Sequence, residues 1–407
     1  MTRCPRGLRR ESDAWVDVEG DHVTMRALPW TDSMRGVGCI LVIVWHVIHT
    51  VIYQFEESFP GAELSTGLGL TIPLGIVARE AVLMFVVLSG YLLGRHWRRT
   101  RPMGAETRGY MVRRSWRLLP PFYAALLLTI AGMLFLGLRE PSGTPWDVGL
   151  PLDWGRVVAS FLLVTDLGGA VPLSHQLWTI PVEYHLYLLG PLLVVLSLRM
   201  RGVMAVTVAL FCLFVIPFPA PYFPIAFVAA FWAGLARQDV KDETFRFRAW
   251  LPLLSFITIA GLALAALAFT LAAPHGRTTE SIRNYILADA LTTPVLLWWV
   301  VRSDIRNRVT PLIRVLVWKP FIWAGHRSFS IYLTHALVVE LAWRWWFDGT
   351  TAWGGPFALY LLVAVVGSLA LGDAFYRTVE LPSARKAARS GRAKIPATTP
   401  PQAKESE

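Results

Sequence analysis

The stretch TDSMRGVGCILVIVWH, from Thr31 to His46, places a cation and an imidazole in one apolar segment. Arg35 stands near its start, and His46 follows eleven residues later. On a helix this separation makes about three turns and ~16 Å of rise, so both side chains share one face. Ionisable groups inside a membrane are costly and usually functional. The alternative is that Arg35 only anchors the topology and that His46 is a hydrogen-bonded packing residue.

The composition is that of a membrane protein. Of the 407 residues, 54% are hydrophobic and only 16% are charged. Apolar stretches of about twenty residues recur, which is the length that spans a bilayer. The net charge of +11 is concentrated in particular loops, so it does not indicate nucleic-acid binding. The three cysteines are scattered, without CxxC spacing, and predict neither a disulfide framework nor a metal site.

The hydropathy pattern predicts an all-α integral membrane protein, a bundle of about ten transmembrane helices. We place the spans at 36–55, 68–94, 118–138, 178–198, 203–218, 222–236, 250–273, 285–301, 321–343 and 356–376. The domain organisation is then a cytoplasmic tail at 1–30, a membrane domain at 31–380 and a tail at 381–407. The last tail is polar, basic and Pro-containing, which predicts disorder.

The loops between these spans differ strongly in basic residues. One alternate set of loops holds 19 Lys and Arg, whereas the other set holds 5. The positive-inside rule therefore predicts that both termini are cytoplasmic. The longest outer connection, 139–177, contains an amphipathic patch at 154–164 that could cap the outer surface.

Polar and ionisable residues recur inside the predicted spans at helical spacing. Glu183 follows Trp178 by five residues, and Tyr187 lies one turn further on. A membrane carboxylate is costly unless it is paired or faces a cavity, so Glu183 is a candidate site residue; a structural ion pair with an arginine is the alternative.

A second set of polar residues lies near the carboxyl terminus. Ser328, Tyr332 and His335 follow a spacing of four and then three residues and share one helix face. His335 taken alone would more often be a satisfied core histidine. Together with His46 and Glu183, it predicts three spans that point a His, a Glu and a His into one cavity.

The predicted inner loop before the third span is rich in arginine. Arg114 and Arg117, three residues apart, enter that span as helix neighbours. A topology loop is one explanation, since positive-inside loops have this composition. Arginine clusters beside apolar surface also suit phosphate or carboxylate recognition.

The order of these motifs resembles the acyltransferase 3 family of integral membrane acyltransferases. Six elements occur in order, at Arg35 and His46 (Arg-x10-His, preceded by Asp32), at Phe85–Leu93 (FVVLSGYLL), at Arg114 and Arg117, at Trp178, Glu183 and Tyr187, at Ser328, Tyr332 and His335, and at Glu380–Pro382. The resemblance spans about 30–385. One departure is the apolar pair Val82 and Leu83, where many members carry Val-Asp.

The resemblance implies transfer of an acyl group, acetyl in the first instance, from acyl-CoA to a hydroxyl of a carbohydrate-containing acceptor. The implied catalytic residues are His46, Glu183 and His335; the implied donor-binding residues are Arg35, Arg114 and Arg117; and the implied substrate-binding residues are Trp178, Tyr187, Ser328 and Tyr332. We expect that the protein binds neither a metal ion nor nucleic acid. We also expect a multi-pass protein of the bacterial cytoplasmic membrane. Its oligomeric state is not predicted by the sequence, and a homodimer is one option.

Two mechanistic points stay open at the level of sequence. His46 suits a general base, which a hydroxyl of high pKa needs, or a transient acyl carrier. A rival interpretation is a transporter in which His46, Glu183 and His335 form a proton relay. Transporters usually show internal repeats in two matching halves, and we find no such match here.

Overall fold

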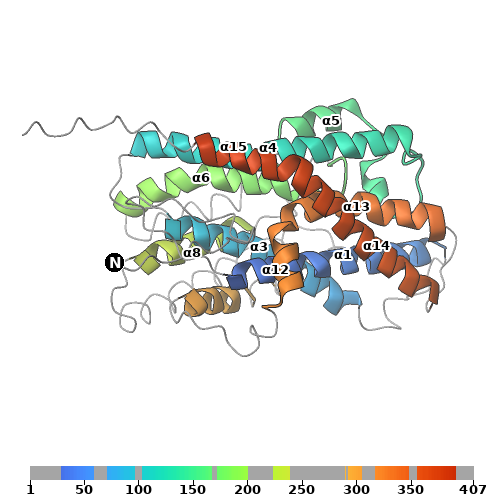
Figure 1. The fold of residues 1–407 in the computed structure, drawn as a ribbon, viewed down its shortest axis with the longest axis horizontal. Coiled ribbons are helices and arrows are strands. Elements are labelled where there is room, and N and C mark those ends of the chain that lie inside the picture. Colours follow the sequence, from blue (N-terminus) through green and yellow to red (C-terminus); the bar gives the residue numbers. More distant parts are fainter. Residues whose placement is uncertain are drawn as a thin grey trace, which may run out of the picture.

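A computed structural model describes residues 29–58, 71–96, 103–166, 172–199, 223–238, 289, 292–304, 317–347 and 355–390. Throughout these ranges the regular structure is helical, and no strand occurs in them. The named elements are α1 (Pro29–Ser58), α3 (Thr71–His96), α4 (Met103–Phe135), η1 (Pro145–Gly149), α5 (Trp154–Phe161), α6 (Thr179–Arg199), α8 (Phe223–Gln238), α12 (Lys319–His326), α13 (Ser328–Ala342), η2 (Trp343–Phe347), α14 (Gly355–Phe375), η3 (Tyr376–Glu380) and α15 (Leu381–Ser390). Most of the long helices follow one common direction (Figure 1).

Four helices in the described part of the chain are long and apolar enough to cross a membrane: Trp30–Ile52, Val77–Arg95, Thr107–Phe135 and Gly355–Ser390. The prediction of an all-helical membrane protein is therefore confirmed. The predicted spans at 178–198 and 222–236 are helical as α6 and α8, and the helical residues 292–304 overlap the predicted span at 285–301. The spans at 203–218 and 250–273 lie outside the described residues, so the total of ten and the side of the termini stay predictions.

Two glycines allow the backbones of α3 and α8 to approach closely. A Cβ on Gly90 of α3 would lie 2.5 Å from the carbonyl oxygen of Phe227 on α8, and one on Gly234 of α8 would lie 2.2 Å from that of Tyr91. Small residues allow such close approach between membrane helices. Gly90 belongs to the FVVLSGYLL motif, and the close approach of α8 explains why a glycine stands at this position.

The predicted span at 321–343 is not continuous. It divides at Arg327 into α12 and α13, and α12 crosses α1 in Figure 1. The crossing is close, because a Cβ on Gly325 would lie 1.7 Å from the carbonyl oxygen of Asp32. Hydropathy reports only how apolar a segment is, so it does not detect a break between two helices that are both apolar.

The segment after α14 differs from the predicted disordered tail. Residues Leu381–Ser390 form α15, which packs along α4 (Figure 1). Ser383 donates a hydrogen bond to the carbonyl oxygen of Trp116, and the ammonium of Lys386 lies 5.2 Å from the centre of the Trp116 ring. The small residues Ser383 and Ala387 are buried against α4, so helix formation is stabilised by packing that composition alone does not reveal. Residues 391–407 lie outside the described residues.

Candidate functional site

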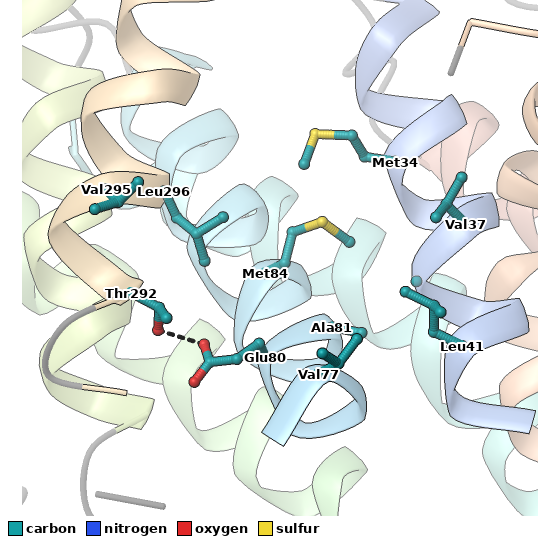
Figure 2. Close-up of a pocket in the computed structure, with 11 residues that line it drawn as sticks. Met34, Val37, Leu41, Val77, Glu80, Ala81, Met84, Thr292, Val295 and Leu296 are labelled. Carbon is teal, nitrogen blue, oxygen red and sulfur yellow. Dashed lines mark hydrogen bonds between the residues drawn. The ribbon is translucent and has the colours of Figure 1, made fainter. Parts of the chain in front are cut away.

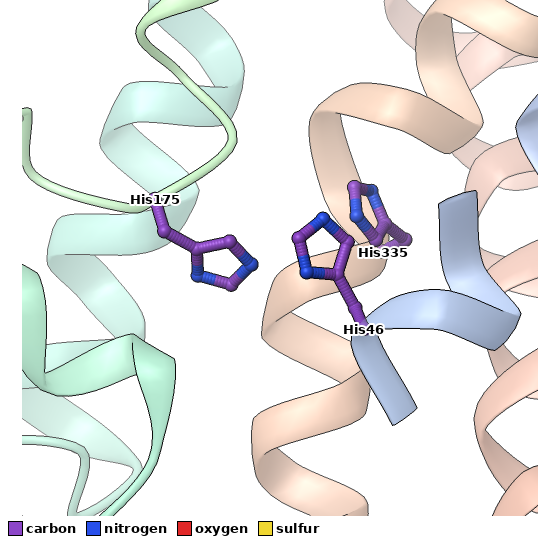
Figure 3. A group of neighbouring side chains, drawn as sticks. All are labelled: His46, His175 and His335. Carbon is purple, nitrogen blue, oxygen red and sulfur yellow. The ribbon is translucent and has the colours of Figure 1, made fainter. Parts of the chain in front are cut away.

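Three histidines from distant parts of the chain meet inside the bundle (Figure 3). His46 comes from the middle of α1, His335 from α13, and His175 from the segment that precedes α6. The ring centre of His46 lies 4.4 Å from that of His175 and 5.1 Å from that of His335. The predicted meeting of His46 with His335 is thus present, and His175 is the member that sequence reasoning missed.

Four of the six ring nitrogens of these histidines are buried without a hydrogen-bond partner. They are Nδ1 of His46, Nε2 of His335 and both nitrogens of His175. Nδ1 of His335 lies 2.7 Å from the carbonyl oxygen of Tyr332, and it must donate its hydrogen there because a carbonyl only accepts. In neutral His335 the lone pair is therefore on Nε2, the nitrogen that faces the cluster.

The connection that carries His175 returns into the bundle. Tyr123, twelve residues before the end of α4, donates to the carbonyl oxygen of Phe161 at 3.1 Å, and the two rings stack 5.5 Å apart. Twelve residues of helix measure about 18 Å, so α5 lies alongside the membrane-spanning part of α4. The amphipathic helix predicted within 154–164 is present as α5, but it is not confined to the outer surface.

Hydrogen bonds hold the backbone around His175 against α13. Nε2 of Gln176 donates to the carbonyl oxygen of Leu333 at 3.3 Å, and the Tyr332 hydroxyl donates to the carbonyl oxygen of Gln176 at 3.0 Å. Thr179 donates in turn to the Tyr332 hydroxyl oxygen at 3.0 Å. Tyr332 therefore positions the His175 segment. Ser328 shares its helix face, as predicted, but is not in the histidine cluster, and its carbonyl oxygen accepts from Cys39.

Glu183 belongs to a second polar cluster. Its carboxylate accepts hydrogen bonds from Tyr187 and from Ser89, the latter at 3.5 Å. The guanidinium carbon of Arg114 lies 4.5 Å from the centre of the Tyr187 ring, where its charge attracts Glu183. The hydrogen bonds that Glu183 makes among the described residues thus join it to Tyr187 and Ser89, and the expected contact with an imidazole is not among them. Trp178, also a predicted site residue, stacks on Phe223 of α8 at 5.6 Å.

The predicted donor-binding arginines have different surroundings. Arg35 forms an ion pair with Asp32 at 3.5 Å and is close enough to Arg117 for their like charges to repel. Arg117 is exposed, whereas Arg114 is half-buried between the rings of Tyr110 and Tyr187. The two arginines of α4 are therefore not equivalent, and Arg117 groups with Arg35.

A separate apolar cavity of about 530 Å³ lies between α1, α3 and 292–304 (Figure 2). Met34, Val37 and Leu41 line it from α1, and Glu80 accepts a hydrogen bond from Thr292 at its edge. None of the three clustered histidines is among its lining residues, so this cavity is distinct from the histidine site.

The histidine cluster also has the spacing that a metal ion could bridge. One ligand nitrogen from each of His46, His175 and His335 lies within 4.8 Å of the other two. Three imidazoles with one open position is a ligand set known from catalytic zinc sites. The sequence predicted no metal, and the chemistry below needs none.

A comparison with protein families matched residues 28–377 to a family described as an acyltransferase domain. The match covers nearly the whole chain, so the protein belongs to the acyltransferase 3 family, as its motifs predicted. Neither curated proteins nor solved structures gave a match. Membership of this family implies membrane acyltransferase activity.

His175 lay within reach of sequence reasoning. It stands three residues before Trp178, at the edge of a motif that the sequence already singled out. His185, two residues past Glu183, is a further polar contact of this connection, because its Nδ1 lies 2.7 Å from a carboxylate oxygen of Asp166. Both histidines depend on the path of the connection before α6, which no local pattern encodes.

Proposed function

We propose that the protein transfers an acyl group, acetyl in the first instance, from cytoplasmic acyl-CoA to a hydroxyl of a carbohydrate-containing acceptor. An exported glycan, a glycolipid and a glycosylated natural product are the acceptor classes that fit. The observation that carries this proposal is the meeting of His46, His175 and His335 at buried, unpartnered nitrogens. An imidazole with a free lone pair, shielded from water, can serve as the general base that acyl transfer to a hydroxyl needs.

In the proposed reaction His46 is the general base. It takes the proton of the acceptor hydroxyl while the acceptor oxygen forms a bond to the carbonyl carbon of the thioester. Collapse of the tetrahedral intermediate breaks the carbon–sulfur bond, and the thiolate leaves with the proton that His46 has held. The products are an ester and free CoA thiol. An acyl group carried on His46 itself is the alternative role for the same residue.

The donor would enter from the end of the bundle that carries Arg35 and Arg117. Two neighbouring cations that repel each other are stabilised by a bound anion, and the phosphates of CoA supply one. Arg35 and His46 are eleven residues apart on α1, or ~16 Å along the helix, so an extended acyl-CoA would link the arginines to the histidines. Arg114, which packs between two tyrosine rings, instead balances the negative charge of Glu183.

The principal test uses purified protein in nanodiscs with radiolabelled acetyl-CoA and a panel of glycan acceptors. His46→Ala should lower acyl transfer by about two to four orders of magnitude, the usual contribution of general acid–base catalysis. His49→Ala is the matched control, since His49 lies on the same helix and stacks on Trp45. Near-normal transfer by correctly inserted His46→Ala protein would overturn the assignment. A labelled acyl-enzyme trapped after acid quench in wild type but not in His46→Ala would identify the carrier role.

The donor site has its own test. Arg117→Lys keeps the charge but loses the planar fork, so we expect a higher KM for acyl-CoA than in wild type, an unchanged KM for the acceptor, and a marked dependence on salt. Arg108→Lys, on the exposed surface of the same helix, is the control. A wild-type donor KM in Arg117→Lys would remove this residue from the donor site.

A further inference from the structure

His175 is the cluster member whose hydrogen-bonding capacity is least used. A neutral imidazole carries one N–H donor and one lone pair. The N–H of His335 donates to the carbonyl oxygen of Tyr332, but both nitrogens of His175 are buried without a partner. A donor that is shielded from water and left unpaired destabilises the fold, so its retention calls for a ligand that completes the bond.

The neighbours of His175 define what that ligand is. If His46 presents a lone pair to the acceptor hydroxyl, the nitrogen beside it that can still donate is on His175. The two nitrogens lie within 4.8 Å of each other. Hydrogen bonds of about 2.7–3.1 Å from two such positions can reach two oxygens bonded to one carbon. The attacking oxygen and the thioester carbonyl oxygen are such a pair in the tetrahedral intermediate.

We propose that His175 is a catalytic residue that donates its N–H to the carbonyl oxygen of the acyl thioester and stabilises the negative charge that develops there. This inference rests on the proposed function. As the acceptor oxygen bonds to the carbonyl carbon, the electron pair of the C=O bond moves onto oxygen, where the His175 N–H holds it. The pair returns when the carbon–sulfur bond breaks, so His175 ends the cycle in its starting state.

The surroundings of His175 suit a donor that stays neutral. Burial of its ring lowers the pKa of His175 to about 3, and positive charge on His335 or His49 would lower it further. The titratable groups that act on it are His46, His335 and His49. A neutral imidazole that acts as an electrophile does not change its charge over the working pH range, in contrast to a general base.

The backbone around His175 is held in place before substrate arrives. Ser174 donates to the side-chain oxygen of Gln176, whose amide nitrogen donates to Leu333 of α13. Residues on both sides of His175 are thus fixed to the helix that carries His335. Donors fixed in this way stabilise transition-state charge without reorganisation, and removal of one such donor typically costs about 10²–10³-fold in rate.

Two variants test the inference. His175→Leu removes the donor and keeps an apolar side chain, whereas His175→Asn keeps an N–H donor. We expect His175→Leu to lower kcat about 10²–10³-fold, with KM for both substrates within about twofold and an unchanged pH dependence of kcat. His175→Asn should recover part of the loss. A wild-type kcat in His175→Leu, or the loss of one limb of its pH profile, would overturn the role of His175 as a hydrogen-bond donor to the thioester.

A second measurement does not depend on turnover. A ketone analogue of acetyl-CoA, with a methylene group in place of the thioester sulfur and a ¹³C-labelled carbonyl, is bound to wild type, His175→Asn and His175→Leu. A hydrogen bond from His175 should lower the carbonyl stretching frequency in wild type relative to His175→Leu. An identical frequency for the analogue bound to the two proteins would refute the contact, and this measurement does not require either protein to be active.

The same experiments separate this inference from the proposed function. If wild type transfers acetyl and His175→Leu does so equally well, only the role of His175 is wrong. If wild type neither binds the analogue nor transfers an acyl group to any acceptor, the proposed function and the inference are both overturned. His49→Ala again serves as the control for the loss of a nearby imidazole.

Discussion

The imidazole rings of His46 and His335 lie 5.1 Å apart, although the two residues come from opposite ends of the sequence. With His175 they present three nitrogens within 4.8 Å of one another. We predict that added zinc inhibits acyl transfer, because zinc binds imidazole lone pairs and would occupy the one that His46 uses as a base. Micromolar Zn²⁺ should inhibit wild type reversibly, EDTA should restore activity, and Mg²⁺ should have no effect.

A related experiment tests whether the purified protein already holds a metal ion. EDTA alone should leave the rate unchanged, and His175→Leu should bind zinc more weakly than wild type, measured by calorimetry. Purified protein that holds stoichiometric zinc and loses activity with EDTA would contradict the expectation of a metal-free site.

A second prediction concerns Glu183. Its carboxylate accepts from Tyr187 and Ser89 and compensates Arg114, so Glu183→Gln should leave the cation of Arg114 unbalanced. We expect lower thermal stability and at least a tenfold loss of activity. Tyr187→Phe removes one charge-assisted hydrogen bond and should cost about 1.5–3 kcal/mol of unfolding free energy. Full activity and stability in Glu183→Gln would show that the negative charge is not needed.

The contact between α1 and α12 gives a third prediction. A Cβ on Gly325 would lie 1.7 Å from the carbonyl oxygen of Asp32, whereas one on Gly355 would meet no atom within 4 Å. Gly325→Ala should therefore lower the free energy of unfolding by about 1–3 kcal/mol or more. Gly355→Ala is the matched control and should change it by less than about 0.5 kcal/mol. Equal stability of the two variants would contradict the close packing.

Acid stability provides a fourth prediction. His175 binds a proton with a pKa of about 3 in the folded state and near 6.5 when unfolded. The unfolded chain therefore binds more protons between these values, so the contribution of His175 is complete above pH 6.5 and is lost as the pH falls toward 3. The melting temperature of wild type should fall more steeply between pH 7 and pH 4 than that of His175→Leu. Parallel curves of melting temperature against pH would show that folding does not lower the pKa of His175.

Sidedness is the fifth prediction. The unequal loops, with 19 against 5 basic residues, predict that the chain emerges on the outer side after α4 and that both termini lie inside. After replacement of Cys4, Cys39 and Cys212, Val148→Cys should react with an impermeant maleimide on intact cells, since Val148 is 46% exposed. Ser390→Cys on exposed α15 should react only after permeabilisation. The reverse pattern would invert the topology.

The sequence predicted what depends on local pattern. Apolar runs predicted helices that are present as α1, α3, α4 and α14, and the position of His46 within its run predicted an internal imidazole. Helical spacing also predicted that Tyr332 and His335 lie together, and their rings are 5.6 Å apart.

What escaped prediction depends on contacts between distant segments. The break at Arg327 lies two residues from the close approach of Gly325 to Asp32, and α15 is stabilised by packing on α4. His175 lies in the cluster because hydrogen bonds from neighbouring residues hold its segment against α13. The separate placement of Glu183 likewise depends on partners from two other helices, Ser89 and Arg114, and hydropathy does not identify such partners.

The connection between α4 and α6 is tied to α13 at both ends. Near its start, Ser142 and Thr144 each donate to a carboxylate oxygen of Glu340 at 2.7 Å, and near its end Gln176 donates to Leu333. These two anchor points lie two helical turns apart on α13. His175 is therefore attached to α13, the helix that carries His335, whereas His46 belongs to α1. Any widening of the cluster to admit substrate is accordingly a displacement of α1 relative to α13, and spin labels on these two helices would report it as a change in one distance.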